Sequence, residues 1–260
     1  MEYFIMKLVT FFLALALTSF ASISSAFANG IDDNCKQLTY KSAPVVNADQ
    51  YICHTEYAIA YSYKSKNPIY TTELLLANHT GSLPRTNDFR VDPAVPTQYQ
   101  AKPKDYHKSG TACNGGRCDQ GHMTPDQDFS ACMVCVHESF FMSNMVPQNY
   151  KNNEVIWKGM EVMFRKYVQT HPAGIYIITG PIYNTATPAT LGNDKVWIPD
   201  SLFKIAIDAQ TGKSIAFLMP NAPESNLSQF VTNLATIEKL TGIRFDNSLD
   251  KFARGNFSDW

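Results

Sequence analysis

The chain has 260 residues, 45% of them hydrophobic, and a formal net charge of −1 at pH 7. This balance excludes a protein that is basic overall, so any contact with a polyanion requires positive charge gathered locally. Neither an internal repeat nor a linker rich in proline, serine and glycine divides residues 29–260, which predicts a single domain.

The N-terminal residues have the three parts of a secretory signal peptide. Lys7 precedes an apolar run at Leu8–Phe20, and small residues follow up to Ala28. A membrane anchor is the alternative, but the run is short against the roughly 20 residues that cross a bilayer. We therefore predict a signal peptide over residues 1–28, cleaved after Ala28. This predicts a secreted or periplasmic protein whose mature chain has no membrane anchor.

Six cysteines, an even number in a chain predicted to be exported, favour disulfides over free thiols. Proximity in the sequence favours the pairs Cys35–Cys53, Cys113–Cys118 and Cys132–Cys135. The alternative is a zinc site built from the last four cysteines, whose Cys-x4-Cys and Cys-x2-Cys spacings suit a metal.

Residues 29–56 show little periodicity and are predicted to form an N-terminal arm. Aromatic and β-branched residues at 57–63 and 69–76 then predict a first hairpin, and prolines predict a loop through residues 85–104. A short apolar strand is predicted at 140–144, where it would pair with the strand that ends at His122.

Further strands are predicted at 175–179, 202–207 and 214–219, the last two as a hairpin around residues 208–213. Apolar residues at helical spacing predict a helix over 228–240, capped by Gly242. A central antiparallel sheet with packed helices gives the α+β class.

The residues most typical of a catalytic site lie between Asp119 and Arg165. The first group is Asp119-Gln120-Gly121-His122, where the glycine lets the backbone turn closely and the imidazole is presented from the end of a strand. The second group recurs every fourth residue, so a helix would carry it as one polar stripe. Its members are Asn153, Trp157, Glu161 and Arg165.

Apolar side chains on a separate arc of this helix, at Ile156, Met160, Met163, Phe164 and Tyr167, predict that it packs against the sheet and leaves the stripe at the edge of a cleft. The alternative is an ordinary surface helix with an intrahelical Glu161–Arg165 pair, which would contribute a few tenths of a kcal/mol.

These groups together resemble the DNA/RNA non-specific endonucleases of the ββα-metal class. That family carries Asp-Arg-Gly-His, then Asn-Met-x-Pro-Gln, then Asn-x3-Trp-x3-Glu. The same order appears here at Asp119–His122, Asn144–Gln148 and Asn153–Glu161. Further similarity runs through residues 85–92, 179–181, 197–199 and 237–242. One position departs from the pattern, because Gln120 stands where the family usually has arginine.

The resemblance implies a ββα-metal nuclease fold and a role for each matching residue. His122 would be the general base, since its ordinary pKa of about 6.5 suits proton removal at neutral pH. Asn153 would be the ligand of Mg²⁺, or of Mn²⁺ in substitution, and Glu161 would hold metal-bound water. Arg165 would neutralise the phosphate, and Asn144 would position the phosphate or His122. Trp157 is predicted to serve packing alone.

Basic residues that could contact the phosphate backbone also crowd near these motifs, namely Lys102, Lys104, Lys108, Arg117, Lys151, Lys158, Arg165 and Lys166. Within the matching segment 85–92, Arg85 is the preferred second phosphate contact. With Gln120 uncharged, Arg85 or Arg117 would have to supply the charge that the family places there.

The resemblance implies a secreted, Mg²⁺-dependent endonuclease that cuts DNA and RNA with little sequence preference and leaves 5′-phosphate ends. Contacts to phosphates alone carry no sequence information, which is consistent with such an activity. Two alternatives are a metal phosphodiesterase acting on small substrates and a weakly active, nucleic-acid-binding member of the family. The sequence does not indicate an oligomeric state or a preference between DNA and RNA.

Overall fold

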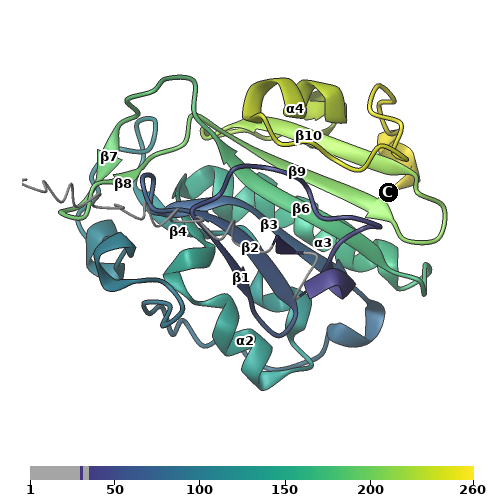
Figure 1. The fold of residues 1–260 in the computed structure, drawn as a ribbon, viewed down its shortest axis with the longest axis horizontal. Helices are drawn as coiled ribbons and strands as arrows, with labels where there is room; N and C mark the ends of the chain where they lie inside the picture. The colour runs from purple at the N-terminus through teal and green to yellow at the C-terminus, as the bar shows by residue number, and fades with distance from the viewer. Residues whose placement is uncertain (1–29, 32–34) are drawn as a thin grey trace, which may run out of the picture.

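The computed structural model describes residues 30–31 and 35–260 (Figure 1). The predicted signal peptide therefore lies outside the described residues. A seven-stranded antiparallel sheet forms the centre, in the order β1-β2-β3-β6-β9-β10-β11. Its strands are β1 (Gln50–Cys53), β2 (Tyr57–Ser62), β3 (Asn67–Leu75), β6 (Ile175–Ile182), β9 (Ser201–Asp208), β10 (Ser214–Pro220) and β11 (Val231–Thr232).

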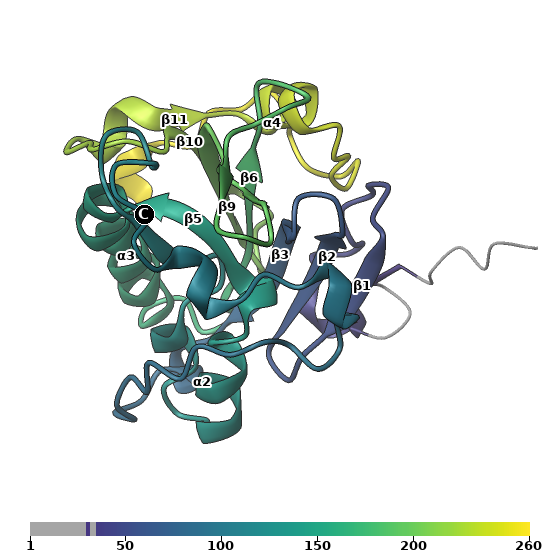
Figure 2. The same ribbon diagram turned by 90° about the vertical axis from the view of Figure 1, so that its left-hand side faces the viewer.

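The two faces of this sheet carry different helices (Figure 2). Alternation along β9 sends Phe203, Ile205 and Ile207 into the core beneath helix α4 (Leu234–Thr241). Leu202 and Ala206 point the other way, into the core beneath helix α3 (Lys158–Val168). This arrangement confirms the α+β class and the predicted hairpins at the centre of the sheet.

A two-stranded ribbon lies on the α3 side, built from β4 (Cys118–His122) and β5 (Met145–Asn149). The strand predicted at residues 140–144 is wrong, because this segment forms a turn and the 3-10 helix Met142–Asn144. The fully buried Asn144 side chain stabilises the turn by donating to the carbonyls of Ser139 and Thr124, both at 2.8 Å. Pairing with His122 therefore starts one residue later, at Met145.

The helix predicted to carry the stripe from Asn153 to Arg165 is confirmed, with a π-helix over Asn152–Trp157 that α3 continues to Val168. Its apolar arc packs against the sheet, with Met160 and Phe164 fully covered and Met163 and Tyr167 partly buried. Trp157 is buried in the same core, as its predicted packing role requires.

Helix α4 is shorter than the helix predicted over residues 228–240. Its first residue follows Asn233, whose side chain accepts from the Thr236 N–H, and Gly242 ends it at φ 73° as predicted. Residues 227–232 instead form a 3-10 turn and the edge strand β11. The N-terminal arm likewise contributes an edge strand, β1.

The remaining elements surround the ribbon. They are helix α2 (Met133–Ser139), the small ribbon of β7 (Thr190–Leu191) and β8 (Val196–Trp197), and 3-10 turns at 36–38, 77–79, 97–99, 103–106, 126–129 and 257–259. Within the part of the chain described here, no helix is long and apolar enough to cross a bilayer.

All six cysteines are oxidised, in the predicted pairs Cys35–Cys53, Cys113–Cys118 and Cys132–Cys135. The zinc alternative is therefore wrong, since the four cysteines that it needs are bonded to one another. The Cys113–Cys118 bridge closes the loop directly before β4.

Candidate active site

A cavity of about 840 Å³ opens between the end of β4, the 152–168 helix and the loop around Asp126. Of the predicted site residues, it brings together Arg85, Gln120, His122, Asn153, Glu161 and Arg165. Asn144 and Arg117 do not line it. Phe89, Asp119, Pro125, Asp126, Gln127, Glu154, Lys158 and Val162 complete the wall.

Gly121 brings β4 close to β5 just before the histidine. A Cβ at this position would lie 2.1 Å from Oε1 and 2.6 Å from Cβ of Gln148. Gln148 cannot move away easily, because it is fully buried and its Nε2 donates to Asn152 at 2.7 Å. The glycine is therefore required for a close approach between strands, and not for the tight turn that the sequence suggested.

His122 is 6% exposed. Its ring is nearly perpendicular to the Phe140 ring, with centroids 4.9 Å apart, and is tilted against the Phe89 ring at 5.7 Å. Its Nε2 atom is buried and has no hydrogen-bond partner among the described residues. Burial first, and then the charges of Arg85 and Lys204, hold the pKa of His122 well below its usual value, although a backbone hydrogen bond at Gln120 opposes them. The imidazole is therefore neutral at neutral pH and can accept a proton.

Asn144 supports the segment that follows the histidine. Its backbone carbonyl accepts from the Met123 N–H at 3.0 Å, and its side-chain Oδ1 accepts from the Thr124 N–H at 3.0 Å. Because Asn144 is fully buried and outside the cavity wall, the structure places it behind His122 and away from a phosphate in the cavity.

Asn153 faces the cavity with a fixed orientation. Its Nδ2 donates to Oδ2 of Asp119 at 3.0 Å. A carboxylate accepts but cannot donate, so the amide nitrogen must point to Asp119 and the amide oxygen is left for another partner. The π-turn at this point is the kind of helix irregularity often found at functional sites.

Arg117 belongs to the layer behind this amide. Its Nε donates to Oδ1 of Asp119 at 3.1 Å, its Nη2 pairs with Glu154, and its guanidinium lies over the Tyr150 ring. It thus holds Asp119, the residue that orients Asn153.

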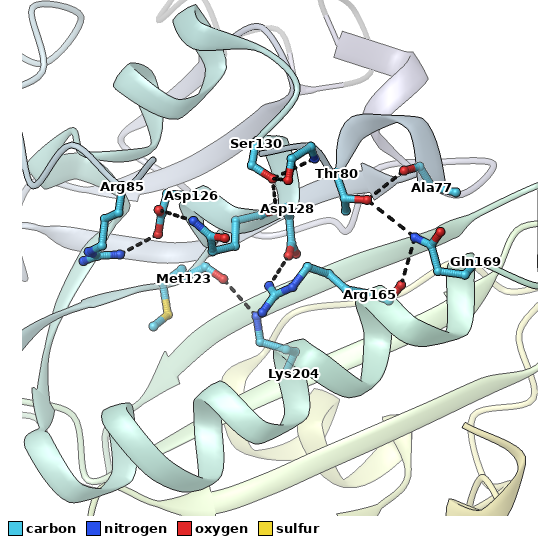
Figure 3. A network of polar contacts seen from close by, with 12 residues as sticks. Ala77, Thr80, Arg85, Met123, Asp126, Asp128, Ser130, Arg165, Gln169 and Lys204 are labelled. Atoms are coloured by element: carbon cyan, nitrogen blue, oxygen red, sulfur yellow. Dashed lines mark hydrogen bonds and ion pairs between the residues drawn. The ribbon is translucent and has the colours of Figure 1, made fainter. Parts of the chain in front are cut away.

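Glu161 and Arg165 lie about two and three turns after Asn153 on the same helix, but they do not form the intrahelical pair of the surface-helix alternative. Arg165 instead pairs with the buried Asp128, at 2.5 Å (Figure 3). Burial raises the pKa of Glu161 to about 7, with nearby acids Asp128 and Asp126 adding to this effect and Lys204 and Arg165 opposing it.

Arg85 reaches the cavity from the loop between the 3-10 turns at 77–79 and 97–99. Its Nη1 pairs with Asp126 at 2.5 Å, and its guanidinium lies 4.8 Å from the centre of the Phe140 ring, next to His122. It stays 42% exposed, so a phosphate in the cavity can reach its remaining donors.

Several charged residues beneath this site were not identified from the sequence. Glu73 and Lys204 are almost completely buried on the central strands β3 and β9, and Asp126 and Asp128 lie on the 3-10 turn after Pro125. The one signal in the sequence for Glu73 and Lys204 is a charged residue inside a strand that is otherwise rich in apolar residues.

Comparison with known proteins identifies the family. Residues 34–252 match the model of the DNA/RNA non-specific endonuclease family. The chain belongs to this family. It is 30% identical to the mitochondrial nuclease EXOG of Xenopus laevis, over 78% of this chain and 59% of that protein.

Two further relatives are human mitochondrial endonuclease G, at 26% identity over 73% of this chain and 67% of that protein, and nuclease C1 of Cunninghamella echinulata, at 27% identity over 80% and 87%. The chain spans about 57–61% of the length of the EXOG relatives that it matches. One chain of a solved complex of EndoG with EndoGI has the same fold, with a TM-score of 0.72 at 21% identity over 83% of this chain and 93% of that one.

These relatives correct one prediction. The secreted or periplasmic location inferred from the N-terminal segment is wrong, because the EXOG and endonuclease G relatives of this non-specific endonuclease family member are mitochondrial proteins.

Proposed function

We propose that this protein is a Mg²⁺-dependent endonuclease that hydrolyses phosphodiester bonds in DNA and RNA with little sequence preference. The observation that carries this proposal is a buried, neutral His122 sharing one cavity with the oriented Asn153 amide. A proton acceptor and an oxygen ligand on the same wall are what metal-assisted hydrolysis requires.

The donor set fits magnesium. The amide oxygen of Asn153 is a hard ligand free to bind, and the described residues contain no cluster of three His, Cys, Asp or Glu side chains that would surround an ion with protein. Magnesium usually keeps several waters and accepts few protein ligands. Glu161, about two turns further along the same helix, can accept hydrogen bonds from such waters. Manganese, with similar ligand preferences, is expected to substitute.

The charge of the cavity supports the same conclusion. Its wall carries three cations, Arg85, Lys158 and Arg165, against four carboxyl groups, which are Asp119, Asp126, Glu154 and Glu161. Without an added cation, the wall offers a phosphodiester no net positive charge. When bound, a divalent ion would supply that charge, polarise a phosphoryl oxygen and stabilise the departing oxygen.

The residues of this chain can then perform hydrolysis as follows. Nε2 of His122 takes a proton from a water molecule, and the water oxygen attacks phosphorus. The bond from phosphorus to the 3′ oxygen breaks, and that oxygen takes a proton from solvent water, which leaves a 3′ hydroxyl and a phosphate on the 5′ side. Arg85 and Arg165 lie on the cavity wall, where their remaining N–H donors can bind the phosphoryl oxygens as negative charge builds up.

The wall also supports the absence of sequence preference. Most of its members are charged or amide side chains suited to phosphate, whereas specific readout requires groups aimed at base edges.

An assay on supercoiled plasmid and on RNA, each with Mg²⁺ and with EDTA, tests the proposal. We expect cleavage of both polymers with Mg²⁺ and none with EDTA. Cleavage of a small phosphodiester ester but of neither polymer would favour the small-substrate alternative. Binding without cleavage would favour the weakly active one.

A further inference from the structure

Lys204 occupies an unusual position for a lysine. It lies in the middle of β9, fully buried, on the face that meets α3 and between Leu202 and Ala206. Removing an ammonium group from water is costly unless strong partners replace the water. The contacts of this side chain therefore indicate what it stabilises.

The first contact is with the base-bearing segment. Nζ of Lys204 donates to the carbonyl of Met123 at 3.0 Å, and Met123 directly follows His122 (Figure 3). A second bond from the central sheet acts next to it, from Thr124 Oγ1 to Thr71 Oγ1 at 3.0 Å. Together with Asn144, these bonds fix the backbone that leaves the end of β4.

The second contact is with the helix that carries Asn153. The ammonium of Lys204 lies 5.0 Å from the centre of the Trp157 ring, in a cation–π arrangement. Trp157 is four residues after Asn153 and four before Glu161, on the same helix. One side chain thus contacts both the segment of the base and the helix of the amide.

The charge of Lys204 also acts on the carboxyl groups behind the cavity. Burial raises the pKa values of Glu73, Asp128 and Glu161, and in each case the charge of Lys204 opposes this rise. Glu73 is 1% exposed, and neither of its oxygens has a hydrogen-bond partner among the described residues. An apolar residue would fill this position of β3 at a lower desolvation cost than an acid, so packing alone does not explain Glu73.

We propose that Lys204 is a positioning residue for the nuclease reaction, which holds the His122 segment and the Asn153 helix in register from beneath the site. This inference rests on the proposed function. Lys204 does not line the cavity, so it acts through Met123 and Trp157 and not on the substrate.

The test compares Lys204→Met with Lys213→Met, a control at an exposed lysine in the turn between β9 and β10. Methionine nearly matches the length of the lysine stem and fills the core, so the charge and the hydrogen bond are what is lost. We expect kcat on DNA to fall by at least about tenfold while KM stays within about threefold, since misplacing the base affects the transition state and not ground-state binding. The Lys213→Met control should match the wild type in both.

A second readout does not depend on activity. In the metal-free protein, NMR titration of the His122 ring should give a higher pKa in Lys204→Met than in wild type. The charges of Lys204 and Arg85 both lower this pKa, and only one of them remains in the variant. A lysine with a merely structural role far from His122 would not move this value.

Removing Lys204 alone takes away the positive charge that opposes the burial of the Glu73 carboxyl group, which can prevent folding. The double variant Glu73→Gln/Lys204→Met removes both ionisable groups and keeps the inference testable if the single variant does not fold. A folded variant of either kind with wild-type kcat, or with a defect in KM alone, overturns the positioning role. If the wild-type protein itself cleaves no nucleic acid with Mg²⁺, the proposed function fails instead, and the NMR result still decides whether Lys204 acts on His122.

Discussion

The carboxylate of Asp119 holds the Nδ2 atom of Asn153 at 3.0 Å, and this bond decides which atom of the amide faces the cavity. Asp119 is held in turn by Arg117, at 3.1 Å. Arg117 thus holds Asp119, and Asp119 holds Asn153, whose amide oxygen is left to face the cavity. Orientation of a metal ligand by a hydrogen-bonded neighbour typically affects metal affinity by about 10–100-fold.

We predict that Asn153→Ala loses most activity and needs far more Mg²⁺, and that Asp119→Ala raises the Mg²⁺ requirement by about 10–100-fold without removing the ligand itself. Cleavage rates measured across a Mg²⁺ titration test both variants. An unchanged Mg²⁺ dependence in Asn153→Ala would refute its role as ligand. The same result in Asp119→Ala would show that the amide keeps its orientation without help.

We predict that His122→Ala lowers kcat by about 10²–10⁴-fold, because it removes the proton acceptor. The Mg²⁺ requirement should stay close to wild type, since the proposed ligand lies on a different element. Circular dichroism and thermal melting check that the fold is kept. Cleavage near the wild-type rate would exclude His122 as the base.

Glu161 gives a prediction about stability and pH. Its pKa in the folded protein is raised to about 7 by burial, from an unfolded value of about 4.3. A carboxyl group with a raised folded pKa binds its proton more tightly when folded, so its contribution to stability is full at acid pH and is lost as pH rises through about 7. At about 1.4 kcal/mol per unit, the loss reaches about 3–4 kcal/mol by pH 8.

Glu161→Gln, which cannot ionise, should therefore melt higher than wild type at pH 8 in EDTA and close to wild type at pH 4.5. The same variant should show a milder Mg²⁺ defect than Asn153→Ala, because it loses contacts to metal-bound water and not to the ion. Thermal melts at the two pH values give the result. Equal melting points at pH 8 would show that the Glu161 carboxylate is not penalised by burial.

The regular strands and helices of this fold follow from local sequence more directly than the site does. The strands around Ile177 and Ile205 are dense in β-branched residues, and Gly242 ends α4 as the sequence predicts. The motif residues His122, Asn153 and Glu161 could be identified by their spacing and resemblance, and the structure places all three on one cavity wall.

The features that sequence did not predict depend on contacts between distant segments. A charged residue within a strand, such as Lys204 in Ser201–Asp208, usually indicates a face exposed to solvent. Here α3 packs on that face and buries the lysine. The strand start at Met145 was displaced by the hydrogen bonds of Asn144 to Ser139 and Thr124, which no local pattern reveals. The role of Gly121 likewise depends on Gln148 of the neighbouring strand.

The Cys113–Cys118 disulfide gives a further prediction. It closes a short loop, for which the chain-entropy model gives about 2 kcal/mol of stabilisation. Replacing both cysteines by serine should lower the melting temperature modestly and lower kcat, since the bridge anchors the first residue of the strand that ends at His122. Mass spectrometry of unreduced peptides should recover the bridge in the wild-type protein. A double variant with unchanged kcat would limit the bridge to a role in stability.

The last prediction concerns Gln120, which lines the cavity where the family resemblance leads one to expect arginine. Glutamine offers hydrogen bonds without charge, so another cation must face the phosphate or the enzyme is slow. Arg85 can do this, since it lines the same cavity and remains 42% exposed despite its pair with Asp126. Arg117 is placed less well, because it is outside the wall and is bound to Asp119 and Glu154.

We therefore expect Arg85→Ala to lower the cleavage rate by about one to two powers of ten, which corresponds to one lost charge-assisted contact of about 1.5–3 kcal/mol. Arg117→Ala should act mainly through Asp119, as a raised Mg²⁺ requirement with a nearly normal rate at saturating Mg²⁺. Gln120→Arg should gain less than tenfold, because Arg85 already supplies a charge. Rates at saturating Mg²⁺ for all three variants decide the matter. A gain of tenfold or more in Gln120→Arg, together with normal cleavage by Arg85→Ala, would show that the natural site is weakened and that Arg85 does not compensate.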